Sequence, residues 1–294
     1  MKKIITSVLI LLANHFVFSQ WNTNPAINNL ISNAANRQFV QRSVSDGKGG
    51  AIITWMDYDG TNNIYKVYAQ SISATGIIKW ATNGIAVCTN TAAQKFPQII
   101  SDNKGGAIII WLDYRGNTGM YAQRINAAGI LQWAAAGIQV APEFIVQDQI
   151  AFTPYIDMTT DNNGGAIIAW ADGRDANGIY LYAQHINAGG VIQWGTGVGG
   201  LPVCSLNLVS EPKIISDNKS GAFIAFSNYS GSYPTGRFDI YAQRISKTGA
   251  EKWGANGIAI CTAAENQKLP EIISDGNGGA IIAWQDTRNS FNTY

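Results

Sequence analysis

Short apolar runs alternate with polar turns along this chain, and they do so at two fixed spacings. In the first block, an aspartate, two polar residues and two small residues lead into an apolar run. The run ends in an aromatic residue nine positions after the aspartate, at Asp46 to Trp55, Asp102 to Trp111, Asp161 to Trp170, Asp217 to Phe226 and Asp275 to Trp284. In the second block, Tyr-Ala-Gln leads through a glycine to a tryptophan twelve residues on, at Tyr68 to Trp80, Tyr121 to Trp133, Tyr182 to Trp194 and Tyr241 to Trp253. The segments between blocks vary in length.

Each block predicts a β-hairpin. In the first, residues 97–102 and 107–111 are two strands joined by Asn-Lys-Gly-Gly, whose glycines permit positive φ. An apolar run such as Ala-Ile-Ile-Ile-Trp is typical of a strand buried on both faces. In the second, residues 121–125 turn at Ala128-Gly129 and return through 130–133. Segments of the type Gly84–Val87 are candidates for a separate strand. Two hairpins make a four-stranded antiparallel unit.

Repetition of this unit predicts an all-β fold, a β-propeller of about five four-stranded blades. Counted from each tryptophan, the units are 21–79, 80–132, 133–193, 194–252 and a partial 253–294, within one repeat domain at 20–294. The last blade is expected to be incomplete, because Tyr294 stands where its Tyr-Ala-Gln would begin. A β-helix or solenoid and tandem β-sandwiches are the alternative folds.

Residues 1–19 are predicted to be a signal peptide, which places the protein outside the cell or on its outer surface. Lys2 and Lys3 precede an apolar run, and Val17-Phe-Ser19 fits a cleavage site. No later segment is apolar enough to span a membrane. The mature chain begins with Trp21-Asn-Thr-Asn, which aligns with Trp80-Ala-Thr-Asn. The N-terminus is therefore expected to complete the outer part of the last blade and close the ring.

Composition narrows the partners. The 294 residues carry 20 Lys plus Arg against 19 Asp plus Glu, so no basic field recruits nucleic acid. The three cysteines, Cys88, Cys204 and Cys261, fill one slot of the repeat and are therefore expected to be unpaired in separate units. No motif for a metal or another cofactor is present. The turn at Asp161 resembles a calcium loop only faintly, and an aspartate bonded to the turn backbone explains it better.

Aspartates and arginines two residues apart are the candidate ligand-binding residues, since both side chains then lie on one face of a strand end. They are Asp113, Arg115, Asp172, Arg174, Arg237, Asp239, Asp286 and Arg288. The alternative, favoured by their repetition, is that they fix loops or join blades. The loops that carry them are predicted to share one face of the disc: 57–63, 113–118, 172–177, 228–239 and 286–292. Their Asp, Arg, Asn and Tyr side chains suit a glycan or another polar ligand.

Catalytic residues are not identified by any motif. His185 replaces the arginine of neighbouring units, has no serine elbow beside it, and is read as a satisfied or exposed histidine. A glycosidase needs two carboxylates. The acids unique to single repeats are Glu143, Asp148, Asp157, Glu211, Glu251, Glu265 and Glu271.

The combination W-x-D-x-R, then I-Y-A-Q-R-I, then G-x-x-x-W-x-x-x-G resembles the tandem repeats of large secreted proteins from bacteria that use type IX secretion. The resemblance covers nearly all of the mature chain and implies export by that route, as part of a longer protein. The chain departs from the pattern at Trp55-Met-Asp57-Tyr-Asp59, which lacks the arginine, and at Phe226-Ser-Asn228-Tyr-Ser230, which lacks all three motif residues. It also lacks a sorting domain.

Three functional classes follow. The main interpretation is a secreted or cell-surface binding or adhesion module for a glycan or another protein. The alternatives are a glycan-active hydrolase or lyase on a five-bladed propeller, and a structural spacer. The pattern leaves the ligand and the oligomeric state open.

Overall fold

The computed structural model describes residues 24, 26, 28–35, 37–60, 62, 64–142, 155–174, 178–195, 197–232, 235–288 and 292–293. The proposed leader, Trp21, Glu143 and Asp148 lie outside them. In this part of the chain no helix is long and apolar enough to cross a membrane.

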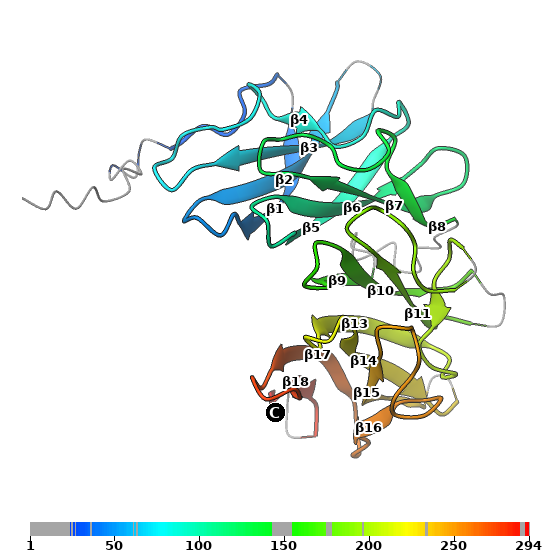
Figure 1. The fold of residues 1–294 in the computed structure, drawn as a ribbon. Coiled ribbons are helices and arrows are strands. Elements are labelled where there is room, and N and C mark those ends of the chain that lie inside the picture. The colour runs from blue at the N-terminus through cyan, green and yellow to red at the C-terminus, as the bar shows by residue number, and fades with distance from the viewer. Residues whose placement is uncertain are drawn as a thin grey trace, which may run out of the picture.

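Five antiparallel sheets follow one another along the chain, as Figure 1 shows. The first strands of the sheets are β1 (Gln38–Ser45), β5 (Gln94–Ser101), β9 (Ile156–Thr160), β13 (Val209–Ser216) and β17 (Gln267–Ser274). The second strands are β2 (Ala51–Tyr58), β6 (Ala107–Asp113), β10 (Ala166–Asp172), β14 (Ala222–Ser230) and β18 (Ala280–Asp286). The third strands are β3 (Tyr65–Ile72), β7 (Gly119–Ile125), β11 (Tyr180–Ile186), β15 (Arg237–Ile245) and β19 (Asn292–Thr293). The fourth strands are β4 (Ile85–Ala86), β8 (Ile138–Ala141), β12 (Leu201–Pro202) and β16 (Ile258–Cys261).

The all-β propeller prediction is confirmed, including the incomplete last blade, which has three strands where the others have four. The sheets lie along an arc, with their first strands on the concave side and the first and last sheets at its two ends (Figure 1). First strands of neighbouring sheets contact one another directly, as β1 does β5 and β9 does β13. Apolar side chains of each sheet pack on the next, as Ile52 and Val67 do on Ile109 and Trp111.

The turn between first and second strands explains the repeated aspartate and the small pair. Asp102 Oδ1 accepts hydrogen bonds from the backbone N–H groups of Lys104 and Gly106, both at 2.8 Å. A Cβ on Gly106 would lie 2.2 Å from the carbonyl oxygen of Ile125 in the third strand, so no side chain fits there. The aspartate therefore closes the turn as predicted, in the manner of an Asx turn.

The prediction for the fourth strand was wrong in position. Residues 130–133 make one bridge to the third strand, Ile125 with Leu131, and the strand proper is Ile138–Ala141. The reason is the buried glutamine of Tyr-Ala-Gln. Gln123 Oε1 accepts from Trp133 N at 3.0 Å, and its Nε2 donates to Ala134 O at 2.9 Å, so a side chain replaces the ladder here. Segments of the Gly84–Val87 type are the fourth strands.

Antiparallel pairing throughout puts the first-to-second and third-to-fourth turns on one face of the arc and the variable connections on the other. The expected closure by the N-terminus is not seen in the described residues, because the last sheet consists of β17, β18 and β19 alone. Asn29 and Asn33 instead bond to the first sheet, at Gly76 O (3.2 Å) and Asn83 Oδ1 (2.8 Å).

Candidate functional site

The Asp–Arg pairs on the variable-connection face are internal ion pairs. The carboxylate of Asp113 is fully buried, and it accepts from Trp111 Nε1 at 3.0 Å and from Arg115 Nε and Nη2 at 2.7 Å each. The Arg115 guanidinium lies 3.9 Å from the centre of the Tyr121 ring and donates to Ala136 O at 2.7 Å. Burial alone would raise the pKa of Asp113, but these hydrogen bonds hold it below its ordinary value.

The same arrangement recurs in the third and fifth sheets. Arg174 pairs with the buried Asp172, stacks 4.3 Å from the centre of the Tyr182 ring and donates to Gly199 O at 3.0 Å. In the fifth sheet, the hydrogen bonds from Arg288 hold the pKa of Asp286 at about 2. Each pair ties its loop to neighbouring backbone, which is the structural alternative stated for the sequence.

The fourth sheet rebuilds the pair from a different strand. Asn228 stands where the motif aspartate is expected, and its partner across the strands is Asp239. Asp239 is buried and accepts from Arg237 Nε at 3.1 Å and from Ser230 Oγ at 2.7 Å. Among the eight candidate residues, Arg237 and Arg288 keep the most exposed side chains, 46% and 37%. Ligand binding by these pairs stays a prediction.

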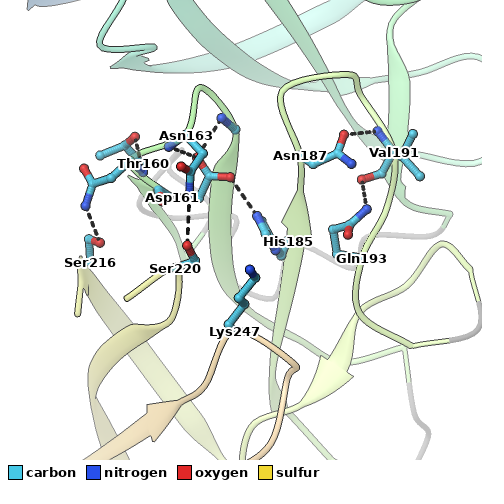
Figure 2. A network of polar contacts seen from close by, with 12 residues as sticks. Thr160, Asp161, Asn163, His185, Asn187, Val191, Gln193, Ser216, Ser220 and Lys247 are labelled. Carbon is cyan, nitrogen blue, oxygen red and sulfur yellow. Dashed lines mark hydrogen bonds and ion pairs between the residues drawn. The ribbon is translucent and has the colours of Figure 1, made fainter. Parts of the chain in front are cut away.

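On the opposite face, the first turns are joined by polar side chains. Asn103 donates to Thr160 Oγ1 and Asn162 Oδ1, and Asn162 in turn donates to Ser216 Oγ and Asn218 Oδ1. Figure 2 shows this network in the third and fourth sheets. In the first sheet Gly47 replaces the asparagine, and a cavity of 530 Å³ lies between its turn and the next one. Lys48 and Lys104 are among its lining residues.

His185 belongs to the same network and is satisfied, as predicted. Its Nε2 lies 2.9 Å from Asp161 Oδ2 (Figure 2), where the neighbouring sheets have Arg124 on Asp102 and Arg244 on Asp217. Asp161 also accepts from the backbone of Asn163 and Gly165. This histidine therefore fixes a turn. The three cysteines are unpaired, as predicted, with Cys88 and Cys204 buried.

A third polar set lies on the concave side of the arc, one residue on each first strand. We call these residues the inner polar row: Arg42, Gln98, Asp157, Lys213 and Glu271. Each stands four residues before the turn aspartate and faces the same position of the second strand, which is Thr54, Ile110, Ala169, Ala225 or Ala283. None of the five is fully buried. The row therefore brings unlike polar groups to equivalent places on adjacent sheets.

Contacts inside the row link the third, fourth and fifth sheets. Lys213 Nζ lies 2.6 Å from Glu271 Oε1, with side chains 37% and 69% exposed. Asp157 Oδ2 accepts from the backbone N–H of Ile214 at 2.9 Å. Burial raises the pKa of Asp157, although that hydrogen bond works in the other direction. Carboxylates of different protonation tendency and one ammonium group thus line the same surface.

A bulge precedes the row in four of the five first strands. Val40, Phe96, Glu211 and Leu269 stand two residues before it, and all have φ between 52° and 56°. Pairing shifts register at the same place, for example between Lys95 and Gln98. Glu211 Oε2 accepts from Leu269 N and from Ser227 Oγ, both at 2.8 Å, and so joins two of these bulges. Bulges re-aim the side chains that follow them, and they are frequent next to functional sites.

Sequence reasoning singled out Asp157, Glu211 and Glu271 only as acids without a motif. The signal that identifies the row is variation: aligned on the turn aspartate, this slot holds Arg, Gln, Asp, Lys and Glu in turn, while its surroundings repeat.

Comparison with known proteins supports the fold. No family model and no curated protein matches the chain. Among solved structures, a GH93 alpha-L-arabinofuranosidase of Fusarium graminearum in complex with arabinobiose matches with a TM-score of 0.50 and 12% identity, over 86% of this chain and 77% of that one. A protein of unknown function from Dyadobacter fermentans matches with 0.49 and 9%, over 90% and 79%. The GH62 alpha-L-arabinofuranosidase domain of Coprinopsis cinerea matches with 0.37 and 14%, over 90% of each chain. At such identities the likeness shows the fold alone, that of a five-bladed propeller.

Proposed function

We propose that this chain is an extracellular propeller that binds a glycan across the inner polar row. One observation carries the proposal: the row is the repeat position at which accessible polar groups differ from sheet to sheet. The Asp–Arg pairs, by contrast, have their hydrogen-bonding capacity engaged internally. The carboxylate of Glu271 can accept from sugar hydroxyls, and the ammonium of Lys213 can donate to them.

A saccharide is favoured over a protein ligand for two reasons. The row is a strip of polar groups on a concave surface, without the exposed aromatic or apolar anchors that dominate protein interfaces. In addition, the solved structure at a TM-score of 0.50 is described as bound to arabinobiose.

The test is binding of arabino-oligosaccharides and of a wider glycan array to the mature chain, residues 20–294, followed by calorimetry. Lys213→Met should lower the affinity for a bound glycan at least about tenfold, which corresponds to the loss of one charged hydrogen bond. Lys219→Met is the matched control, because Lys219 is an exposed lysine in the first turn of the same sheet. Equal affinities of the two variants, or no glycan bound at all, would reject the proposal.

Glycan hydrolysis is the second candidate, and the raised pKa of Asp157 favours it. Glycosidases pair a carboxyl group that stays protonated with a second, ionised carboxylate. Asp157 and Glu271 would take these parts. Chromogenic arabinofuranosides and a wider glycoside panel test it: Asp157→Asn and Glu271→Gln should each abolish turnover, and the exposed control Glu265→Gln should not. If the wild type turns over no substrate, hydrolysis is rejected and binding stands on its own assay.

Export is part of the proposal and rests on the leader-like residues 1–19. N-terminal sequencing of the protein recovered from the culture medium or the outer surface should give Gln20 as the first residue. Recovery from the cytoplasm with Met1 intact would overturn it.

A further inference from the structure

The last sheet exposes an apolar face that every earlier sheet buries. We call the face of a sheet that points to the next sheet in sequence its forward face, and the opposite face its rear face. Six residues after the turn aspartate, the forward face carries an apolar side chain in all five sheets. The exposed fractions of these side chains are Ile52 0%, Ile108 0%, Ile167 0%, Phe223 3% and Ile281 55%.

A second position of the forward face shows the same change. Val44, Ile100 and Ile215, two residues before their turn aspartates, pack into the apolar clusters between sheets. Ile273 at the equivalent position is 62% exposed, and Leu269 on the same strand is 55% exposed. Three large aliphatic side chains on β17 and β18 therefore face solvent together.

The repeat itself specifies the chemistry that covers such a face. Each earlier forward face packs on an alanine and an isoleucine from the rear face of the next second strand. These pairs are Ala107 and Ile109, Ala166 and Ile168, Ala222 and Ile224, and Ala280 and Ile282. The interface is thus directional, since forward and rear faces are different surfaces that fit one another.

The first sheet offers the matching rear face. Ala51 and Ile53 occupy the alanine and isoleucine positions and are only half-buried, whereas Ile109, Ile168 and Ile224 are fully buried. The first and last sheets stand at opposite ends of the arc (Figure 1). One molecule therefore carries both halves of an inter-sheet interface, separated in space.

We propose that a second copy of this chain docks head to tail, with the rear face of its first sheet on the forward face of the last sheet. The contact continues the interface already formed four times within the chain. Because the two surfaces differ, the association is heterologous, and further copies can add to either end. Burial of Ile273 and Ile281 drives it through the hydrophobic effect.

Sedimentation velocity of the mature chain across a wide range of concentrations tests the proposal. The wild type should form species larger than a monomer as its concentration rises. The double variant Ile273→Lys/Ile281→Lys blocks the forward face and should be monomeric, as should Ile53→Lys, which blocks the rear face. Ile130→Lys is the control: Ile130 is 60% exposed in a third-to-fourth turn, and its replacement should leave association unchanged.

Mixing the two blocked variants gives the decisive result. The Ile53→Lys protein keeps a functional forward face and the double variant keeps a functional rear face, so the mixture should form a 1:1 dimer and nothing larger. Self-association of Ile53→Lys alone would indicate pairing of two last sheets and overturn the proposal, as would a monomeric wild type at every concentration. Hydrogen exchange of wild-type β17 and β18 covers the case of a misfolded variant: protection should rise with protein concentration, and unchanged protection counts against docking.

Discussion

Two polar positions of the repeat, the Asp–Arg pair and the inner polar row, are used in opposite ways. The pair is nearly invariant, its aspartates are buried, and its arginines donate to backbone carbonyls of their own sheet. The row is different in every sheet and remains accessible, with Glu271 69% exposed. Both positions read as charged residues in the sequence. The contrast teaches that, in a repeat protein, a charged residue copied from unit to unit marks shared architecture, and a charged slot that varies marks the place for recognition.

The largest expected effect comes from removing one buried partner. Asp113→Ala should lower the free energy of unfolding by about 3 kcal/mol, because it leaves the Arg115 guanidinium and Trp111 Nε1 without their acceptor. Asp57→Ala is the matched control, since the Asp57 carboxylate accepts from Gln38 at 3.3 Å and the arginine of the motif is missing from its sheet. It should cost about 1 kcal/mol. Urea denaturation measures both, and equal losses would contradict the role assigned to the pair.

Acid should destabilise the fold through the same carboxylates. The pKa values of Asp113, Asp161, Asp217 and Asp286 are lowered in the folded protein, for Asp286 to about 2. The unfolded chain, with aspartate pKa values of about 3.9, takes up these protons first as the pH falls. The stabilisation is therefore present above about pH 4 and is lost progressively toward pH 2.

The melting temperature as a function of pH measures this loss. Arg288→Met should make the acid-dependent fall in melting temperature shallower, because the folded pKa of Asp286 then rises toward the unfolded value. Arg42→Met removes the same charge from the inner polar row and should leave the fall unchanged. A melting temperature independent of pH between about 5 and 2.5 would contradict the assignment.

Relief of the bulge should have a smaller effect of the opposite sign. Val40 has φ of 54°, a region that disfavours β-branched residues. Val40→Gly should raise the free energy of unfolding by up to about 1 kcal/mol, the relief of strain exceeding the entropy cost of glycine. Ser43→Gly, at an ordinary β position of the same strand, should lower it. Destabilisation of both variants to the same extent would show that no strain is stored at Val40.

The smallest effect is expected within the inner polar row. Glu271→Gln breaks the ion pair with Lys213, but both side chains are well exposed, so stability should change by less than about 0.5 kcal/mol. Thermal melts together with glycan affinity sharpen the contrast. A loss as large as that of Asp113→Ala would remove the distinction between the two positions.

The sequence predicts the fold well because its two spacings are rigid. Asp-to-Trp and Tyr-to-Trp intervals do not vary, and each corresponds to a turn closed by side-chain hydrogen bonds, from Asp102 and from Gln123. The position of the fourth strand escaped prediction because a buried glutamine side chain substitutes for ladder hydrogen bonds, and no apolar periodicity reports that. Residues 130–133 look like a strand and make a single bridge.

The candidate site was harder to predict than the fold. A sequence places Asp157, Lys213 and Glu271 more than fifty residues apart from one another, and only the common register of five first strands brings them to equivalent places. The Asp–Arg pairs attract notice because they repeat, and repetition is a consequence of packing. The Asp239 pair shows the same limit, since nothing local reveals that Asp239 stands across from Asn228.

The outer tryptophans give the arc a direction. The indole N–H groups of Trp80, Trp133 and Trp194 each donate to a carbonyl oxygen in the following sheet, those of Ala127, Ala188 and Lys247. Such bonds connect sequence neighbours only, so the fold is mechanically a chain of links in series. Pulled from its C-terminus, it should peel one sheet at a time from the free end, and a duplicated or deleted repeat would lengthen or shorten the arc without disturbing the links on either side.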